Sequence, residues 1–319
     1  MADITGQVVT NRLSTSHRGR LSELIARNIF LICAVLIVVI IVCVFVFVGI
    51  SAYQMFGDDP NSRNFLSTIN WDPAGLRGVT SYGMLGFILG SVITTLLAVI
   101  IATPLSFGMA LFMTEVCPKW LENILRPLIE IFTGMPSVVI GFLATIALVP
   151  LIKSTIGLYT PIPAVAGFGW AAAIVVLVVM IIPTIISISI DALRAVPGSI
   201  REASLALGSS HWQMMKDAIL PAATTGLATA VVLGMGRAIG EALAVSLVLK
   251  GNGALPGQLL TPFVFFGPNI NMTSPIVLNF SESGGAERDA YLMLGFLLLV
   301  ISFLFVCVSR YLASRSVYK

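Results

Sequence analysis

The sequence predicts an all-α membrane protein with six transmembrane helices, and three features lead to this: the composition, the long apolar runs and the placement of basic residues. Of 319 residues, 57% are hydrophobic and 10% are charged, and the mean hydropathy is +0.99. Ordinary soluble domains carry about 25% charged residues. The net charge of +3 follows from basic loops between the spans and does not indicate nucleic-acid binding.

Apolar runs long enough to cross a bilayer occur six times. The first, Phe30 to Ile50, contains no charged residue and is long enough for a hydrocarbon core of about 30 Å at about 1.5 Å per residue. A signal peptide is the alternative, but an h-region of about 7–15 residues is shorter, and no small-x-small cleavage site follows. The other five spans are expected at residues 82–113, 127–152, 167–191, 219–248 and 290–309.

The basic residues orient these spans. An even number of spans places both termini on one side, and the side richer in Lys and Arg faces the cytoplasm. Of the eighteen Lys and Arg residues, twelve lie in the termini and the loops on their side, five lie in the opposite loops, and Arg237 lies within a span. Both termini are therefore expected in the cytoplasm. The expected segments are a cytoplasmic tail at 1–27, the first span and a periplasmic loop at 28–82, a transmembrane domain at 83–312 with a cytoplasmic loop at 197–217 and an outer loop at 249–288, and a second tail at 313–319.

Several kinds of chemistry are not expected. The four cysteines have no paired spacing, so we expect neither a disulfide nor a metal site. His17 and His211 both lie outside the spans, so no Ser-His or His-metal group can assemble at membrane depth. The sequence has no Gly-x-x-x-x-Gly-Lys-Ser/Thr loop, so it is not expected to bind ATP itself. An enzyme is therefore the weakest of the functional classes.

The outer loop at 249–288 is longer than a hairpin between two spans requires, and it is rich in turn-forming residues. It is expected either to meet a soluble partner outside the membrane or to fold as a packed cap on the protein itself. The sequence does not favour one of these over the other.

A polar segment between the fourth and fifth spans predicts a short helix, a tight turn and the start of the fifth membrane helix. Ser199 and Glu202 have the spacing of a capping box, in which each side chain satisfies a backbone donor of the other residue. Gly208 can adopt the left-handed conformation that ends a helix, and Ser209 or Ser210 can cap the next helix. The helix after the turn is expected to be the start of the fifth span, with Pro221 near its entry.

The same segment has the composition of a docking surface. Small residues leave room for close approach by another surface, while basic residues around them add charge. The alternative is that Glu202 only caps a helix and that the loop only connects two spans. The residues expected to dock are Glu202, Ala203, Ser204, Gly208 and Trp212.

Arg237 and Glu241 lie within the fifth predicted span. Four residues apart they would share one helix face, and each costs roughly 2.5–3.5 kcal/mol at the centre of a membrane helix. Such a pair is expected to face a polar cavity, where Arg237 would present planar donors to an oxyanion. Glu241 would neutralise the empty site and accept the O–H of hydrogen phosphate, which sulfate lacks. A structural ion pair between helices is the alternative.

Two motifs resemble a known family. Glu202-Ala203-Ser204, followed by Gly208 and then by Leu220-Pro221, resembles the EAA loop of ABC-importer permeases, which docks on an ATPase subunit. The sequence departs from that pattern at Ser204 and Ala218, where the family usually has Ala and a larger aliphatic residue. The segment 236–241 resembles the C-type membrane subunit of bacterial Pst phosphate importers, as do the segments 110–115, 135–141 and 182–184.

The resemblance, which covers about 83–312, implies a type I ABC-importer permease fold. It implies a phosphate path lined by Arg237, Glu241 and Ser137, although the Ser137 hydroxyl has the alternative role of satisfying backbone freed by Pro136. It also implies a location in the bacterial inner membrane. The implied partners are a homologous A-type permease, two ATPase subunits that bind ATP and Mg, and a periplasmic or lipid-anchored phosphate-binding protein, while this chain binds no cofactor.

Two other functions remain open at this stage. A permease of another oxyanion importer, for sulfate or molybdate, fits the same motifs, because selectivity in such systems can reside mostly in the external binding protein. A secondary anion transporter or channel would account for six spans and a buried Arg-Glu pair, but it leaves the spacing from Glu202 to Pro221 unexplained.

Overall fold

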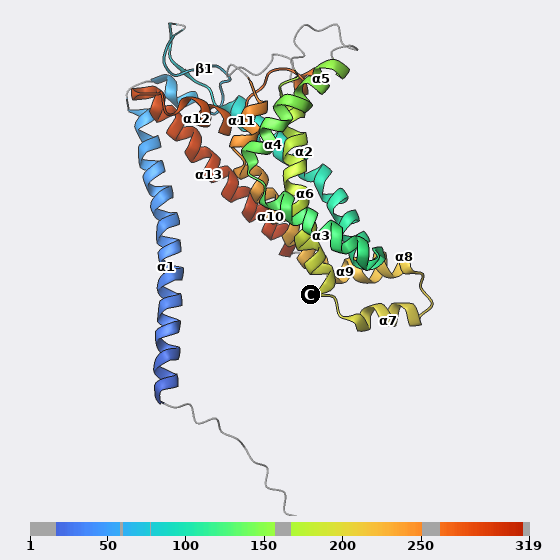
Figure 1. Cartoon of the computed structure of the whole chain (residues 1–319). Helices are drawn as coiled ribbons and strands as arrows, with labels where there is room; N and C mark the ends of the chain where they lie inside the picture. Colours follow the sequence, from blue (N-terminus) through green and yellow to red (C-terminus); the bar gives the residue numbers. More distant parts are fainter. Residues whose placement is uncertain (1–16, 58–59, 77, 157–166, 251–261, 315–319) are drawn as a thin grey trace, which may run out of the picture. The chain divides into compact units, whose positions relative to one another are not determined.

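The computed structural model describes residues 17–57, 60–76, 78–156, 167–250 and 262–314, and these are almost entirely helical (Figure 1). The chain divides into two units, Met1–Phe47 and Val48–Lys319. The first unit contains most of helix α1, His17–Tyr53, and the second contains all later elements. The predicted tails fall partly outside the described residues, at 1–16 and 315–319.

The described residues contain five helices that are long and apolar enough to span a membrane. A sixth span is formed by a helix pair, His211–Ala222 and Thr224–Gly240, that is bent by 71°. The prediction of an all-α protein with six spans is therefore confirmed when the bent pair counts as one span. The five single spans are Glu23–Phe56, Leu85–Val116, Ser137–Ile156, Trp170–Arg194 and Gly285–Tyr311.

The second unit is built from helices of very different length, and its one sheet among the described residues pairs β1 with β2 in antiparallel register. The strands are β1 Trp71–Asp72 and β2 Ser81–Tyr82. The α-helices are α2 Leu85–Leu111, α3 Lys119–Gly134, α4 Ser137–Leu143, α5 Val149–Ile156, α6 Trp170–Arg194, α7 Gly198–Ala206, α8 His211–Gln213, α9 Leu220–Ala222, α10 Thr224–Gly240, α11 Leu243–Val248, α12 Thr273–Asn279 and α13 Gly285–Ser314. Three π-helical turns, Phe112–Val116, Ala144–Leu148 and Met214–Ile219, continue α2, α4 and α8, and 3₁₀ turns form at Gln54–Phe56, Pro60–Asn64 and Pro262–Phe265.

The third span starts later than predicted. Its apolar helix begins at Ser137, and the preceding stretch forms the separate helix α3, none of whose residues is buried. Met135 has an extended backbone, with φ −65° and ψ 135°, because the ring of Pro136 disfavours helical geometry at the residue before it. The predicted boundary at 127 is therefore wrong: Pro127 lies inside α3 and does not start a span.

The fifth span is not the continuous helix predicted over 219–248. It bends by 71° after Ala222, and it stops again after Gly240, where Glu241 has an extended backbone with φ −76° and ψ 109°. The short helix α11 resumes two residues later. Two of the six predicted spans are therefore interrupted in the structure, the third before Ser137 and the fifth after Ala222 and again after Gly240.

The core of the second unit forms around α6, which packs against α2 and α10. The segment from Val264 to Ser274 of the outer loop is largely buried, and Trp170 Nε1 donates to the carbonyl oxygen of Ile270 at 3.0 Å. This part of the loop is a packed cap on the protein, one of the two predicted alternatives. Residues 251–261 of the same loop lie outside the described residues.

Candidate functional site

Arg237 lies in the last turn of α10 and is half-buried. Its Nη1 donates to Thr184 Oγ1 on α6 at 2.8 Å, and its Nη2 donates to the carbonyl oxygen of Thr133 at 3.4 Å. Thr133 lies in the last turn of α3. The last carbonyls of a helix lack intrahelical partners and carry partial negative charge, so a cation is stabilised there. Arg237 therefore joins α3, α6 and α10 at one point.

The predicted pairing of Arg237 with Glu241 is wrong. α10 ends at Gly240, so the two side chains do not share a helix face. Glu241 Oε1 instead accepts a hydrogen bond from the backbone N–H of Ala244 at 3.2 Å, near the start of α11. Both residues are described, and no ion pair joins them. The hydrogen bonds that hold the Arg237 guanidinium in the described structure therefore go to neutral oxygens.

The breaks in the third and fifth spans lie close together. α4 approaches α11 so closely that a Cβ on Gly141 would meet Ala244 Cα at 2.7 Å. Thr145 Oγ1 donates to the carbonyl oxygen of Leu247 at 3.2 Å. Before the breaks, Arg237 joins α10 to the end of α3, and after the breaks, α4 contacts α11. The two breaks therefore lie at one level of the protein.

Ser137 is the first residue of α4, directly after the break in the third span. It is half-buried, and its hydroxyl has no hydrogen-bond partner among the described residues. The alternative role, in which this hydroxyl satisfies backbone freed by Pro136, therefore has no hydrogen bond to support it. The region of the two breaks therefore contains the cation of Arg237, the carboxylate of Glu241 and the Ser137 hydroxyl.

The turn between α7 and α8 has the predicted form. Gly208 has φ +83°, a left-handed conformation that glycine adopts without steric cost, and its N–H donates to the carbonyl oxygen of Leu205 at 2.9 Å. Ser204 Oγ lies 2.7 Å from Ser209 Oγ, and this hydrogen bond ties the two sides of the turn together. Ser210 caps α8 in a capping box with Gln213. The substitution of Ser for Ala at 204 therefore stabilises the turn.

The start of α7 differs from the prediction. Its N-cap is Pro197, and no side chain caps the helix, so the capping box predicted for Ser199 and Glu202 is wrong. Glu202 and Ala203 are exposed instead. Next to the turn, Leu207 is 90% exposed and Trp212 is 65% exposed. Two large apolar side chains beside a glycine turn form a surface suited to docking, and Leu207 was missed because its exposure depends on the turn.

Arg201 of α7 is one of the basic residues that were expected to add charge around the docking surface, but its side chain points into the protein. Its Nη2 forms an ion pair with Glu115 Oε1 at 3.0 Å, and the Glu115 side chain is only 9% exposed. The guanidinium also donates to the carbonyl oxygens of Leu193 at 3.0 Å and Val196 at 2.7 Å, at the end of α6. Arg201 therefore fastens α7 to α2 and α6. The available signal was a single carboxylate at the end of an otherwise apolar span.

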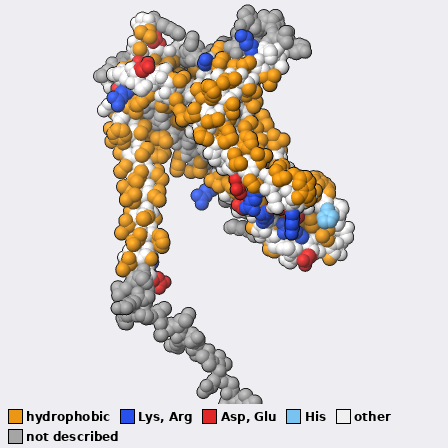
Figure 2. Space-filling view, viewed as in Figure 1, with side chains coloured by type: hydrophobic (Ala, Val, Ile, Leu, Met, Phe, Trp, Pro, Cys, Tyr) orange, Lys and Arg blue, Asp and Glu red, His pale blue; other side chains and the backbone are white. Residues whose placement is uncertain are grey.

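A second ion pair lies nearby. Arg194, the last residue of α6, pairs with Glu122 in the first turn of α3. Figure 2 shows Lys, Arg, Asp and Glu side chains gathered near the end of the second unit that carries α7 and α8, next to a broad apolar region. This is the distribution expected where helices leave a bilayer.

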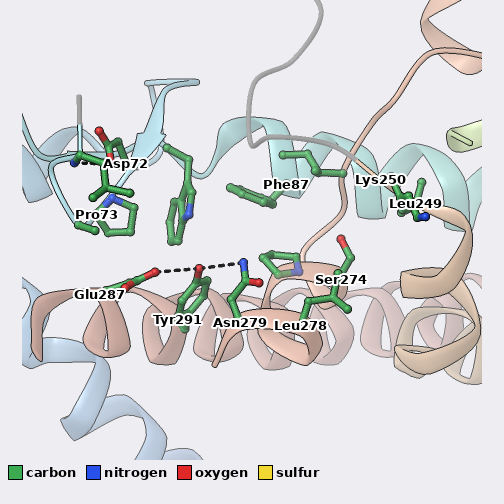
Figure 3. A pocket seen from close by; sticks show the side chains of 15 residues that line it. Asp72, Pro73, Phe87, Leu249, Lys250, Ser274, Leu278, Asn279, Glu287 and Tyr291 are labelled. Carbon is green, nitrogen blue, oxygen red and sulfur yellow. Dashed lines mark hydrogen bonds between the residues drawn. The ribbon is translucent and has the colours of Figure 1, made fainter. Parts of the chain in front are cut away.

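A pocket of about 370 Å³ that the sequence did not predict lies near β1 and α12 (Figure 3). Trp71 packs against Phe87 and Tyr291 with ring centroids 5.0 and 5.5 Å apart. Tyr291 donates to Glu287 Oε1 at 3.3 Å and accepts from Asn279 Nδ2 at 3.2 Å. The pocket combines aromatic walls with the carboxylates of Asp72 and Glu287, the amide of Asn279 and the ammonium group of Lys250.

Comparisons with known proteins agree with this architecture. Residues 102–318 match the family described as binding-protein-dependent transport system inner membrane component. The chain is 41% identical over 313 residues to the probable ABC transporter permease protein YqgH of Bacillus subtilis, covering 96% of each chain. It is 32% identical over 325 residues to the phosphate transport system permease protein PstC of Pasteurella multocida, covering 97% of this chain and 96% of that protein.

Solved structures with a similar fold are also ABC transporters. A bacterial ABC transporter involved in the import of the acidic polysaccharide alginate aligns with a TM-score of 0.60 at 17% identity, covering 94% of this chain and 100% of that chain. The MetNI methionine ABC transporter in an inward-facing conformation aligns with a TM-score of 0.58 at 16% identity, covering 74% of this chain and 96% of that chain.

Proposed function

Because the chain belongs to the family of binding-protein-dependent transport system inner membrane components, we propose that it is the permease subunit of an ATP-driven importer of inorganic phosphate. The phosphate assignment rests on its similarity to phosphate transport system permease proteins. Within the chain, one observation supports it most: Arg237 lies between interrupted spans with no acidic partner in the described structure.

The chemistry of the breaks suits phosphate. A guanidinium presents several N–H donors in one plane, which matches two oxygens of a phosphate. No carboxylate neutralises the charge of Arg237 in the described structure, so the guanidinium can attract an anion. Glu241 uses only Oε1 for its hydrogen bond to Ala244, so Oε2 is available to accept the O–H of hydrogen phosphate. Sulfate is fully deprotonated at neutral pH and cannot donate to that oxygen.

We infer that both termini and the turn between α7 and α8 face the cytoplasm, as the basic residues predict. Glu202, Ala203, Ser204, Gly208 and Trp212, together with Leu207, would then dock on a separate ATPase subunit. That subunit would bind ATP and Mg and hydrolyse the ATP, and this chain would hold no cofactor. A phosphate-binding protein, periplasmic or lipid-anchored, would deliver the solute on the opposite side of the membrane.

A second permease is the remaining partner that we propose. One side of the path is open in this chain, because a Cβ on Gly236 or Gly240 would meet no other residue within 4 Å. Helix α3 likewise exposes the apolar side chains of Trp120, Ile124 and Ile131. A homologous A-type permease that covers these surfaces would complete the path, and two ATPase subunits would then serve the heterodimer.

The decisive experiment is uptake of labelled phosphate by proteoliposomes that contain the whole complex, with ATP inside and the phosphate-binding protein outside. We expect ATP-dependent uptake that equimolar sulfate does not reduce. Inhibition by equimolar sulfate would contradict the phosphate assignment and would favour another oxyanion as the substrate. Full-rate uptake by the chain without an ATPase would instead establish a secondary transporter or channel.

A further inference from the structure

Helix α3 is tied at both ends to α6. Arg194 of α6 pairs with Glu122 near the start of α3, and the Arg237 guanidinium bridges Thr133 near its end to Thr184 of α6. At about 1.5 Å per residue, the stretch from Glu122 to Thr133 is about 16 Å long and the stretch from Thr184 to Arg194 is about 15 Å long. The two helices therefore run antiparallel between matched ties.

The end of α3 that carries Glu122 lies beside the attachment of α7. Arg201 binds the carbonyl oxygen of Leu193, the residue before Arg194, and pairs with Glu115 in the turn that precedes α3. A displacement of α7 is therefore transmitted to the last turn of α6 and to the residues that lead into α3. Both transmitting ion pairs are formed by long side chains that can shift without unpacking a core.

Helix α3 is also suited to move as one body. None of its residues is buried. The residues that flank it, Pro118 with ψ 147° and Met135 with ψ 135°, are extended, so α3 is separated from its neighbours by a non-helical residue at each end. Terminal residues of this kind absorb backbone rotation in hinge motions. Within the described chain, α3 is held by these polar ties at its ends and by Leu125 and Ile129, whose partly buried side chains pack against the neighbouring core.

On the basis of the function proposed above, we propose that α3 is a connecting rod through which the docking turn controls Arg237. When the ATPases move α7, the pairs Arg201–Glu115 and Arg194–Glu122 carry the displacement to α3. The carbonyl oxygen of Thr133 then moves relative to Arg237. In one position it occupies a guanidinium donor, and in the other that donor is presented to the anion. Glu115, Glu122, Arg194 and Arg201 are thus positioning residues, which act on the solute only through Arg237.

The test compares two substitutions of glutamate on the same helix. Glu122→Gln breaks the tie between α3 and α6, whereas Glu130→Gln breaks an exposed pair with Arg126 that lies within α3 and joins it to nothing else. We expect Glu122→Gln to lower the number of phosphate ions transported per ATP hydrolysed by about fivefold, the effect of losing one partly exposed ion pair. Glu130→Gln should leave this ratio within about twofold. Equal ratios for the two variants would overturn the proposal.

Exchange of the two charges separates positioning from folding. The double variant Glu122→Arg with Arg194→Glu re-forms the pair in the opposite direction, and we expect it to recover at least half of the ratio lost in Glu122→Gln. ATPase copurification, measured for each variant, verifies assembly. A double variant that assembles fully and recovers nothing would show that this pair is not the tie.

A readout that needs no solute distinguishes this proposal from the proposed function. With the four native cysteines replaced by alanine, Thr133→Cys would report the position of the α3 end through its rate of maleimide labelling. We expect the rate to change about fivefold between nucleotide-free and ATP-bound complex, to lose that change with Glu122→Gln and to keep it with Glu130→Gln. If the labelling rate does not depend on nucleotide, the proposal that α3 transmits movement is wrong. If the labelling rate depends on nucleotide but the complex takes up no phosphate, only the assignment of phosphate as the solute is wrong.

Discussion

Arginines hold both ends of α3, but the arginines at the two ends differ in whether a carboxylate neutralises their charge. At the end near α7, Arg194 and Arg201 each pair with a carboxylate, and both pairs are partly exposed. At the other end, Arg237 meets a hydroxyl and a backbone carbonyl. A neutralised arginine fixes the positions of helices, whereas an arginine held by neutral oxygens keeps its charge for another ligand. In the mechanism that we propose, this contrast separates the part of the protein that transmits movement from the part that meets the solute.

The free energies support this separation. A partly exposed ion pair contributes at most about 1 kcal/mol, because water screens both charges. An arginine at the centre of a membrane helix costs roughly 2.5–3.5 kcal/mol on insertion scales, and the C-terminal dipole of α3 offsets about 0.3–1 kcal/mol of this. An anion that binds to this arginine neutralises its charge and so offsets the rest of this free-energy cost. The position that is least favourable in the empty protein is therefore the one most sensitive to substitution.

The largest effect is expected for Arg237→Gln. The variant keeps a side chain that can donate to Thr184, but it loses the charge, and a hydrogen bond to a charged group is worth about 1.5–3 kcal/mol. Phosphate uptake by the assembled complex should fall roughly 10- to 100-fold. Arg126→Gln, which removes an arginine already paired with Glu130, is the matched control and should transport normally. Similar losses in both variants would erase the distinction between paired and unpaired arginines.

The next largest effect is expected at the turn between α7 and α8, which lies next to the end of α3 where the arginines are paired with carboxylates. Gly208→Val places a β-branched residue at φ +83°, which costs about 1–2 kcal/mol and reshapes the turn. We expect ATP hydrolysis to persist while phosphate uptake falls about tenfold. Gly198→Val is the control, because a Cβ meets nothing within 4 Å at either glycine but Gly198 has no positive φ. Normal coupling in Gly208→Val would show that the docking surface tolerates a changed turn.

A smaller and more selective effect is expected at the carboxylate beside the unpaired arginine. Glu241→Gln retains an oxygen that can accept from the N–H of Ala244, so the hydrogen bond at the start of α11 is kept, but it removes the negative charge that favours a donor O–H. The preference for phosphate over sulfate should fall by no more than about tenfold, near the lower end for a charge-assisted hydrogen bond, because the glutamine oxygen can still accept a neutral one. Uptake of both anions measured in the same vesicles provides the ratio. An unchanged ratio would limit Glu241 to its hydrogen bond with the backbone of Ala244.

The sequence predicted several elements that depend on local chemistry. Gly208 has the predicted positive φ, and four of the six predicted spans form as unbroken helices, although the capping box of Ser199 and Glu202 does not form. The sequence did not show which prolines end a membrane helix. Pro104 and Pro183 lie inside α2 and α6, whereas α3 ends before Pro136. The break at Glu241 has no proline at all. Because Arg237 and Glu241 are close in sequence, a continuous helix seemed to pair them, and only the observed break separates their roles.

The pairing of Arg201 could not be predicted for a different reason. Its partner Glu115 is 86 residues away in the chain, and nothing in the local pattern distinguishes a side chain that turns inward from one on a docking surface. The same holds for Leu207, whose exposure follows from the position of the turn. Contacts that join distant segments are therefore what the structure adds to the site.

The smallest effect is expected at Ser137, which tests whether the unpaired end also offers neutral donors to the solute. Ser137→Ala removes a hydroxyl without a partner among the described residues, so the empty protein should lose no stability, and only a contact with the anion would be lost. Such a neutral hydrogen bond is worth about 0.5–1.5 kcal/mol, which predicts a two- to threefold higher KM for uptake at the lower part of that range. Ser154→Ala, at the other end of the same span, removes a hydroxyl bonded to Leu151 and should leave KM unchanged. If Ser137→Ala also transports with the normal KM, the solute contacts are confined to Arg237 and Glu241.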